Sequence, residues 1–349
     1  MTLLTDITEM QAPLTGASAS AFAHHPGYQR MFRDGALTLG VFLPLCFYQG
    51  DMRVLAGQAD LVSQLDRDGF AAAWVRDVPL FDPLFGDAGQ VFDPFTYLAY
   101  LAARTERLAL ATGSAIFSLR HPIDLAKSAA SIDQLSGGRL VLGIASGDRP
   151  VEFPAYGLDH AARGGRFAAS VAYVRQLMQA GPLQISSPLG DVQGVELLPK
   201  PGAGAIPLLV TGTSRQTLDW VGQHADGWLT YPEATHDAAG PTRLAARIQA
   251  WRRLIPDGGF RPHVTNAWLD LVDDANHPRT PINGGYTLKT GRNGLIDLLG
   301  QWRQTGVNHA ALGIQFSQRP AAEVLQELAE YVLPLFPSHP GPPPAQVRW

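Results

Sequence analysis

The chain has 349 residues, of which 46% are hydrophobic, so it is long enough and apolar enough to bury a large core. Its 27 Lys and Arg residues nearly balance its 31 Asp and Glu residues without forming a basic stripe, which argues against nucleic-acid binding. The single cysteine, Cys46, excludes an intrachain disulfide, and no apolar run approaches the roughly 18 residues of a membrane span.

Both ends of the chain are expected to lie outside the folded body. Residues 1–34 are rich in Ala, Ser and Thr and are predicted to form a partly disordered extension, in which His24 and His25 have no ligand role. This extension lacks the basic start and apolar core of a secretory signal, so a cytoplasmic location is expected. Residues 338–349 contain four prolines and are predicted to form an extended tail.

Between these ends, short apolar runs alternate with longer segments of helical periodicity. Near-continuous apolar runs are typical of parallel strands that helices cover on the outside. The predicted strands are 37–43, 70–75, 107–112, 139–145, 206–211, 227–231, 263–271 and 307–314. The predicted helices are 52–68, a helix capped by Asp93, 123–135, 167–180, 215–224, 243–254, 293–305 and 321–333.

Strict alternation of about eight strands with eight helices favours one closed TIM-type (β/α)8 barrel over residues 35–337, rather than an open sheet. Two connections are longer than such a barrel needs. Residues 182–205 include a possible hairpin near 193–197, and a surface insertion and a functional loop are equally compatible with their sequence. Residues 272–290 follow the seventh predicted strand, where loops carry function, so they are a candidate for the active-site mouth.

Small residues follow the third and fourth predicted strands. Gly113 and Ser114 would let a flat ring approach the backbone, with tight packing at the barrel top as the alternative. In the next loop, Ser146 and Gly147 would let backbone N–H groups approach an anion, and Arg149 would supply charge. A plain glycine turn explains this second string equally well.

The fifth predicted strand ends in Gly212, Thr213 and Ser214, and Thr217 follows at the start of a helix. Free N–H groups and hydroxyls at a helix start form a phosphate cradle. The alternative is that Thr213 or Ser214 is merely a helix cap. Because the fourth and fifth strands are predicted neighbours, their loops can converge on one phosphate.

Several kinds of site are excluded by the residues present. The first predicted strand ends in Phe42-Leu43-Pro44 rather than in a His-x-His pair, and HExxH is absent, so no metal site is expected. No Gly-x-Ser-x-Gly nucleophile elbow and no convincing pair of glycosidase acids occur.

Taken together and in order, several segments resemble the luciferase-like monooxygenase family, from about Gly35 to Phe336. Each segment alone is common, but their order is specific. The matching segments are Phe70–Val75, His121–Leu140 with Asp133-Gln-Leu-Ser-Gly-Gly-Arg139, Gly143–Phe153, Ala225–Trp228, Gly306–His309 and Glu327–Phe336.

The resemblance implies a monooxygenase that uses reduced FMN, supplied by a flavin reductase, and O2 on a small organic substrate. A deazaflavin coenzyme with hydride transfer, or a non-catalytic flavin-binding protein, are the alternatives. Many members of the family are dimers, so a homodimer is expected. The resemblance also implies phosphate contacts at Ser146, Ser214 and Thr217, and a non-proline cis peptide at Gly113–Ser114.

One departure from the family pattern concerns the catalytic base. Val78 stands where the luciferase histidine would be, after Trp74-Val75-Arg76-Asp77. Arg76 and Asp77 are therefore candidates for catalytic roles, with a structural ion pair as the alternative. Adjacent strand residues point to opposite faces, so at most one faces the flavin, and Arg76, on the face of Trp74, is favoured.

Overall fold

The structure is a computed structural model. The predicted disorder of residues 1–21, the start of the predicted helix 52–68 and the prolines beyond residue 340 lie outside its described part. The described residues are 22–46, 56–85, 91–231 and 239–340.

Within these residues, eight parallel strands close a barrel, and all eight predicted strands are present. The sheet runs in chain order around the barrel, and the last strand, β12, pairs with β1. Strands β1 and β9 are buried at every residue, as expected of a layer covered on both sides. The barrel strands are β1 (Thr38–Phe42), β2 (Ala72–Val75), β3 (Ala109–Ile116), β4 (Leu140–Ala145), β7 (Leu208–Thr211), β8 (Gly227–Thr230), β9 (His263–Leu271) and β12 (His309–Gly313).

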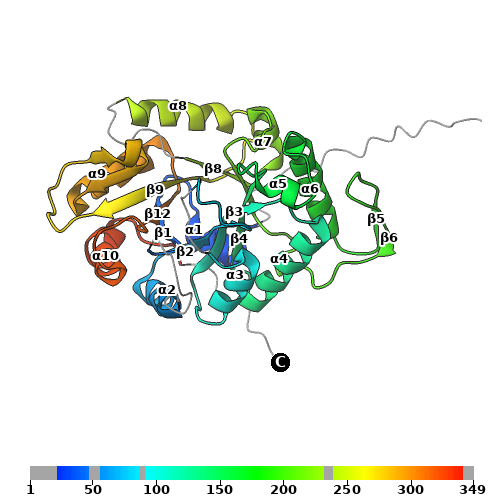
Figure 1. Ribbon diagram of the computed structural model, residues 1–349, viewed down its shortest axis with the longest axis horizontal. Helices are drawn as coiled ribbons and strands as arrows, with labels where there is room; N and C mark the ends of the chain where they lie inside the picture. Colours follow the sequence, from blue (N-terminus) through cyan, green and yellow to red (C-terminus); the bar gives the residue numbers. More distant parts are fainter. Residues whose placement is uncertain (1–21, 47–55, 86–90, 232–238, 341–349) are drawn as a thin grey trace, which may run out of the picture.

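Helices surround the strands on the outside of the barrel (Figure 1). Asp93 caps α3 as predicted, because its carboxylate accepts the Thr96 backbone N–H at 2.9 Å. Beyond α10, the chain continues through a π turn (Leu328–Val332) and a 3₁₀ turn (Leu333–Leu335). The surrounding helices are α2 (Ala56–Asp68), α3 (Pro94–Ala102), α4 (Pro122–Ser136), α5 (Glu152–Ala155), α6 (Arg163–Leu177), α7 (Leu218–His224), α8 (Gly240–Arg252), α9 (Arg292–Thr305) and α10 (Ala321–Glu327).

Most element boundaries differ from the prediction by a few residues, and two of these differences lie at the carboxyl end of the barrel, near the predicted site. Strand β3 continues to Ile116 through a register break between Thr112 and Ala115. Helix α7 begins at Leu218 rather than Arg215, because Ser214 and Arg215 have left-handed φ angles of 46° and 66° that no α-helix accommodates.

The two long connections form small antiparallel pairs. Strands β5 (Leu183–Ile185) and β6 (Val192–Val195) make the hairpin that the sequence suggested, at the periphery of the molecule (Figure 1). Strands β10 (Thr280–Ile282) and β11 (Thr287–Thr290), with the 3₁₀ turn Asn283–Gly285 between them, extend the barrel sheet beside β9. No helix among the described residues is both long and apolar enough to cross a membrane.

The chain before β1 closes the amino-terminal end of the barrel. Helix α1 (Pro26–Met31) packs there, and its apolar residues join the cluster that fills the barrel interior. His25 accepts the Tyr28 backbone N–H at 3.1 Å, and its Nε2 atom lies 3.5 Å from the Asp133 carboxylate. From Phe22 onward, the segment predicted to be partly disordered is therefore folded against the barrel. The buried apolar residues of this segment are Phe22, Tyr28, Met31 and Phe32.

A buried polar network lies beside α1 at the barrel floor. The Trp74 indole N–H donates to His309 Nε2 at 3.0 Å. His309 Nδ1 lies 2.7 Å from the Thr38 hydroxyl, which in turn donates to the Met31 carbonyl at 2.7 Å. These contacts are all satisfied by a neutral His309 that carries its proton on Nδ1.

Acid should destabilise the fold through two buried histidines. Burial lowers the pKa values of His263 and His309 from 6.5 to about 3. Below pH 6.5, these histidines bind protons in the unfolded chain but not in the folded protein. The free energy of unfolding therefore decreases as the pH falls, by roughly 2 kcal/mol for each histidine at pH 5. Urea unfolding of the parent and His309→Gln between pH 7 and 5 should show a shallower pH dependence for the variant, by up to one proton.

The comparison between the parent and His309→Gln cancels a contribution of Glu152 to the pH dependence of stability, which has the opposite sign to that of the histidines. Burial raises the pKa of Glu152 to about 7, against the influence of Arg149, so this carboxyl favours the folded state as the pH falls. Glu152 is unchanged in both proteins. Equal pH slopes for the two would contradict the assignment of a neutral, proton-excluding His309.

Candidate functional site

Two adjoining cavities, which share lining residues, open at the carboxyl ends of the barrel strands. The first, called here the polar chamber, has a volume of about 330 Å³, and the second, the aromatic chamber, about 710 Å³. Active sites of TIM barrels lie at this end, and cavities of this size hold cofactors and small substrates. The residues that line both chambers are Arg76, Gly113, Asp148, Thr211 and Tyr231.

The polar chamber is cationic. The loop after β4 contributes Ser146, Gly147 and Arg149, and the loop after β7 contributes residues 212–215. The two strands are hydrogen-bonded neighbours, and their loops converge on this one cavity. Arg163, at the start of α6, adds a further guanidinium group to the lining. Arginines at positions 149, 163 and 215 thus outnumber the carboxylates at Asp77 and Asp148, which favours an anionic ligand.

The loop after β7 is held in a fixed conformation. The Ser214 hydroxyl donates to the Thr211 carbonyl at 2.8 Å, and the Trp228 indole donates to the Gly212 carbonyl at 2.7 Å. Gly212 has a φ of 56°, and a Cβ atom there would meet no other atom within 4 Å. Glycine is therefore favoured at this position by the left-handed backbone of the turn and not by a lack of space for a side chain.

The end of β3 lies between the two chambers. Its Gly113–Ser114 peptide bond is cis, as the resemblance implied. The Ser114 hydroxyl hydrogen-bonds the Thr211 hydroxyl of β7. A Cβ atom on Gly113 would lie 2.5 Å from the Phe42 ring, so only glycine allows this close packing.

Arg76 and Asp77 follow β2 and have different surroundings. The Asp77 carboxylate accepts the Ile116 backbone N–H at 2.9 Å and the Arg120 guanidinium at 2.8 Å. The Arg76 guanidinium lies 5.3 Å from the centre of the Trp268 ring and lines both chambers. Asp77 thus makes the ion pair considered as the alternative, whereas Arg76 is placed at the junction of the chambers.

Not all of the predicted cofactor contacts lie at the chambers. Gly113, Ser114, Ser146, Gly147, Arg149, Gly212, Thr213 and Ser214 line the polar chamber. Thr217 is exposed and is not among the lining residues. Its hydroxyl accepts the Trp220 backbone N–H at 3.1 Å, so it is the N-cap of α7, a role that the sequence analysis gave to Thr213 or Ser214.

Sequence reasoning missed Arg163 and Arg215. A Cβ atom on Gly164 would lie 2.9 Å from the Cβ of Arg215, so the start of α6 approaches the loop after β7 closely. Burial is the main cause of the lowered pKa of Arg163, and the positive charge of the nearby Arg215 lowers this pKa further. The glycine pair after Arg163 is the sequence feature that permits this close approach. It could not be interpreted from the sequence alone, because the loop after β7 that it approaches is distant along the chain.

The aromatic chamber is built around Trp268 of β9. Tyr286 stacks on the Trp268 ring with centroids 5.8 Å apart, and Phe316 meets it edge-on at 6.0 Å. Phe42 approaches at 5.5 Å. Asn283 and Tyr286 come from the long segment after β9, so this segment lines the aromatic chamber, and its role in an active-site mouth stays a prediction.

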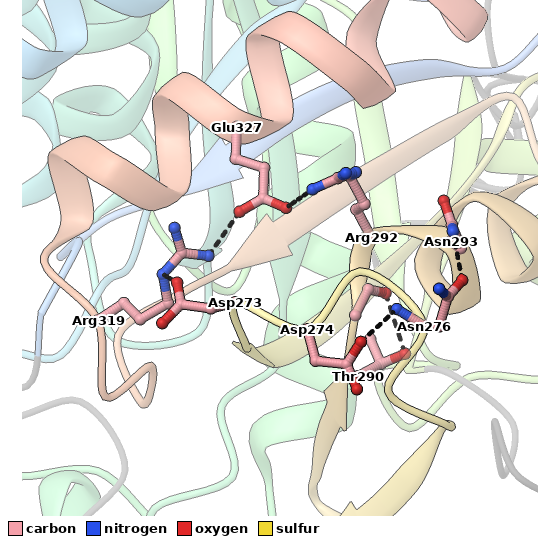
Figure 2. Close-up of polar contacts among 9 residues, drawn as sticks. Asp273, Asp274, Asn276, Thr290, Arg292, Asn293, Arg319 and Glu327 are labelled. Carbon is pink, nitrogen blue, oxygen red and sulfur yellow. Dashed lines mark hydrogen bonds and ion pairs between the residues drawn. The ribbon is translucent and has the colours of Figure 1, made fainter.

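Polar contacts tie this long segment to the end of the barrel, as Figure 2 shows. The buried Glu327 carboxylate of α10 accepts from Arg292 at 2.9 Å and from Arg319 at 2.6 Å. Arg319 also pairs with Asp273, at the start of the segment, at 2.7 Å. The network anchors the base of the segment that carries Tyr286.

A (β/α)8 barrel with a cationic chamber and an aromatic chamber at the carboxyl ends of its strands has the design of a barrel enzyme that binds an anionic ligand. The family model described as luciferase-like monooxygenase matches residues 37–261. The chain belongs to the luciferase-like monooxygenase family.

Individual relatives agree with this assignment. The alpha chain of alkanal monooxygenase from Photorhabdus luminescens is 26% identical over 210 residues, which cover 60% of this chain and 55% of the relative. The matches span about half to two thirds of the length of such curated relatives.

Solved structures share the fold at lower identity. The monooxygenase RslO1 from Streptomyces bottropensis has a TM-score of 0.72 at 20% identity, covering 85% of this chain and 99% of that protein. An F420-dependent secondary alcohol dehydrogenase has a TM-score of 0.68 at 17% identity, covering 86% and 99%.

Proposed function

We propose that this protein is an FMN-dependent monooxygenase that uses reduced flavin and O2 on a small organic substrate. The observation that carries the proposal is the junction of a cationic chamber with an aromatic one beside the Gly113–Ser114 peptide. FMN has the same two parts, a phosphate and a flat ring system.

The residues present fit FMN. Arg149, Arg163 and Arg215, with the backbone of the loops after β4 and β7, offer charge and donors for a phosphate. Gly113 keeps the wall between the chambers flat, because any side chain there would collide with Phe42. We therefore place the phosphate in the polar chamber and the ring against Gly113 and Ser114.

A deazaflavin coenzyme is the second candidate, because the fold is shared with an F420-dependent dehydrogenase. Both cofactors carry an anionic group and a flat ring, so the chambers suit either. Titration of the protein with FMN and with the deazaflavin coenzyme, followed by absorbance and fluorescence, distinguishes them. Tight binding of FMN and turnover of a substrate with reduced FMN and O2 support the proposal; binding of the deazaflavin alone contradicts it.

Bound reduced FMN would supply electrons to O2, and the protein would supply position, charge and exclusion of water. Phe42, Trp268 and Phe316 form apolar walls around the aromatic chamber, which limits the access of water. The Arg76 guanidinium, at the junction, would stabilise negative charge on the substrate or on oxygen. Asp77 would hold the strand end through Arg120 rather than touch the reacting atoms.

The position of the luciferase histidine is taken by Val78, which lines the polar chamber. Proton transfer, where the reaction needs it, must therefore involve another group. We further propose that reduced FMN comes from a separate flavin reductase, that the protein is a cytoplasmic homodimer, and that Thr217 makes no phosphate contact.

Replacing Arg76 by alanine should separate chemistry from cofactor binding. We expect FMN affinity within about twofold of the parent, because the phosphate chamber keeps its other three arginines. Substrate oxygenation should fall on the order of a hundredfold, the scale for removal of one charge-stabilising donor. Oxygen consumption should then appear as hydrogen peroxide, measured with a peroxidase-coupled assay.

Arg67→Ala is the matched control, since Arg67 is exposed on α2, bonds to the neighbouring Gln64 and lines neither chamber. It should change neither product yield nor peroxide release. If Arg76→Ala weakens FMN binding as much as turnover, Arg76 belongs to cofactor binding or to the fold instead.

A further inference from the structure

Phe85 and Arg149 form a stacked pair across the border between the two chambers. Phe85, in the loop after β2, lines the aromatic chamber, and Arg149, in the loop after β4, lines the polar chamber. The Arg149 guanidinium lies over the Phe85 ring, 4.4 Å from the ring centre. Arg149 is 5% exposed and Phe85 is 41% exposed, so a buried cation supports a ring that is still open to a ligand.

The turn that carries Phe85 is weakly attached to the rest of the described structure. Its printed backbone hydrogen bonds stay within the turn, because the N–H groups of Leu84 and Phe85 donate to the Asp82 carboxylate at 2.9 Å and to the Asp82 carbonyl at 3.1 Å. The side chains of Leu84 and Phe81 are 96% and 56% exposed, so they bury little surface that would hold the turn in place. The position of the Phe85 ring therefore depends largely on its contact with Arg149.

A guanidinium group can hold a ring and an anion at the same time. Its N–H donors lie in the plane of the group, whereas its flat face stacks on aromatic rings. Arg149 can therefore donate to a phosphate from its edge while its face stays against Phe85. A bound anion restricts the orientation of the guanidinium plane, and with it the position of the ring. A ligand of the aromatic chamber then meets an ordered wall and loses less entropy on binding.

We infer that Arg149 couples the two chambers: an anion bound in the polar chamber fixes Phe85 and so strengthens the binding of a flat apolar ligand in the aromatic chamber. The inference rests on the proposed function in one respect, that the anion is the phosphate of the flavin. Arg149 is thus a positioning residue for Phe85, and the substrate binds more tightly after the flavin than before it. Because a coupling free energy is reciprocal, the substrate strengthens binding of the anion by the same factor.

The test is calorimetric titration of the whole chain, without flavin, with 2-naphthol, a neutral compound of two fused rings. The titration is made at equal ionic strength in phosphate-free buffer and at saturating inorganic phosphate. Phosphate should tighten the binding of 2-naphthol about fivefold, at the lower end of the usual range of coupling between two sites. Phe85→Leu keeps an apolar side chain without the ring, and Arg149→Lys keeps the charge without the flat face. Each variant should reduce the gain to less than about twofold.

Phe85→Tyr and Leu84→Ala are the matched controls. Tyrosine restores the flat ring at position 85, so Phe85→Tyr should keep the full gain from phosphate. Leu84 is the exposed neighbour of Phe85 and lines neither chamber, so Leu84→Ala should keep it as well. Loss of the gain in Leu84→Ala, or in Phe85→Tyr, would assign the effect to the loop as a whole and would contradict the role of the stacked pair.

A separate titration with phosphate alone distinguishes failure of this inference from failure of the proposed function. If phosphate binds but leaves the affinity for 2-naphthol unchanged or weaker, or if 2-naphthol does not bind under either condition, the coupling is overturned while the placement of the phosphate stands. If phosphate alone does not bind, the placement of the cofactor phosphate in the polar chamber is contradicted, and the coupling is contradicted with it.

Discussion

Replacing Ser214 by aspartate should weaken FMN binding by at least about 1.5–3 kcal/mol, the scale of a charge-assisted hydrogen bond. Ser214 is buried in the wall of the polar chamber, in the loop that also carries Arg215. The carboxylate would place a negative charge beside the proposed phosphate dianion and would neutralise part of the positive field. Quenching of flavin fluorescence measures the dissociation constant directly.

Ser214→Asn is the matched control, because it differs from Ser214→Asp mainly in charge. Ser214 has a φ of 46°, and Asn and Asp are among the non-glycine residues that tolerate left-handed backbone best. Loss of affinity in the aspartate variant alone would support phosphate binding here. Unchanged affinity in Ser214→Asp would mean that the phosphate lies elsewhere.

Replacing Gly143 by alanine should destabilise the fold by about 3 kcal/mol or more, at the upper end of the usual cost of overpacking. A Cβ atom on Gly143 would lie 2.2 Å from the Thr112 carbonyl oxygen, and this is a backbone atom that no rotamer change can move. Strands β3 and β4 would have to separate beside Gly113 and Ser114. Urea unfolding should therefore show the loss, and FMN binding should weaken with it.

Gly300→Ala provides the comparison for this prediction. Gly300 lies within α9, and a Cβ atom there would meet no other atom within 4 Å. Alanine in a helix interior is favoured over glycine by roughly 0.5–1 kcal/mol, so this variant should be as stable as the parent or more so. A Gly143→Ala protein of parental stability would show that the barrel wall yields easily at this point.

The barrel could be predicted because its signal is local and repeated. The run 139–145, for example, is apolar after Arg139, and the structure has strand β4 at Leu140–Ala145. The packing of the chain from Phe22 to β1 could not be predicted, because the composition of this segment resembles that of a flexible tail. Its few apolar residues, such as Phe22 and Met31, gain their burial from the barrel floor, which composition alone does not reveal.

The candidate site could be predicted in part for the same physical reason. Glycines and hydroxyl residues after β4 and β7 predict loops whose backbone a ligand can approach closely, and those loops line one chamber. Arg163 could not be found in this way, since it reaches the chamber from the start of a helix distant in sequence.

A crystal structure of the FMN complex would show where the phosphate and the ring bind. We expect phosphate oxygens within hydrogen-bonding distance of the loop at residues 212–215 and of the arginines of the polar chamber. We also expect the ring to lie against the Gly113–Ser114 peptide. A phosphate bound outside the polar chamber, or a ring away from Gly113, would contradict this placement.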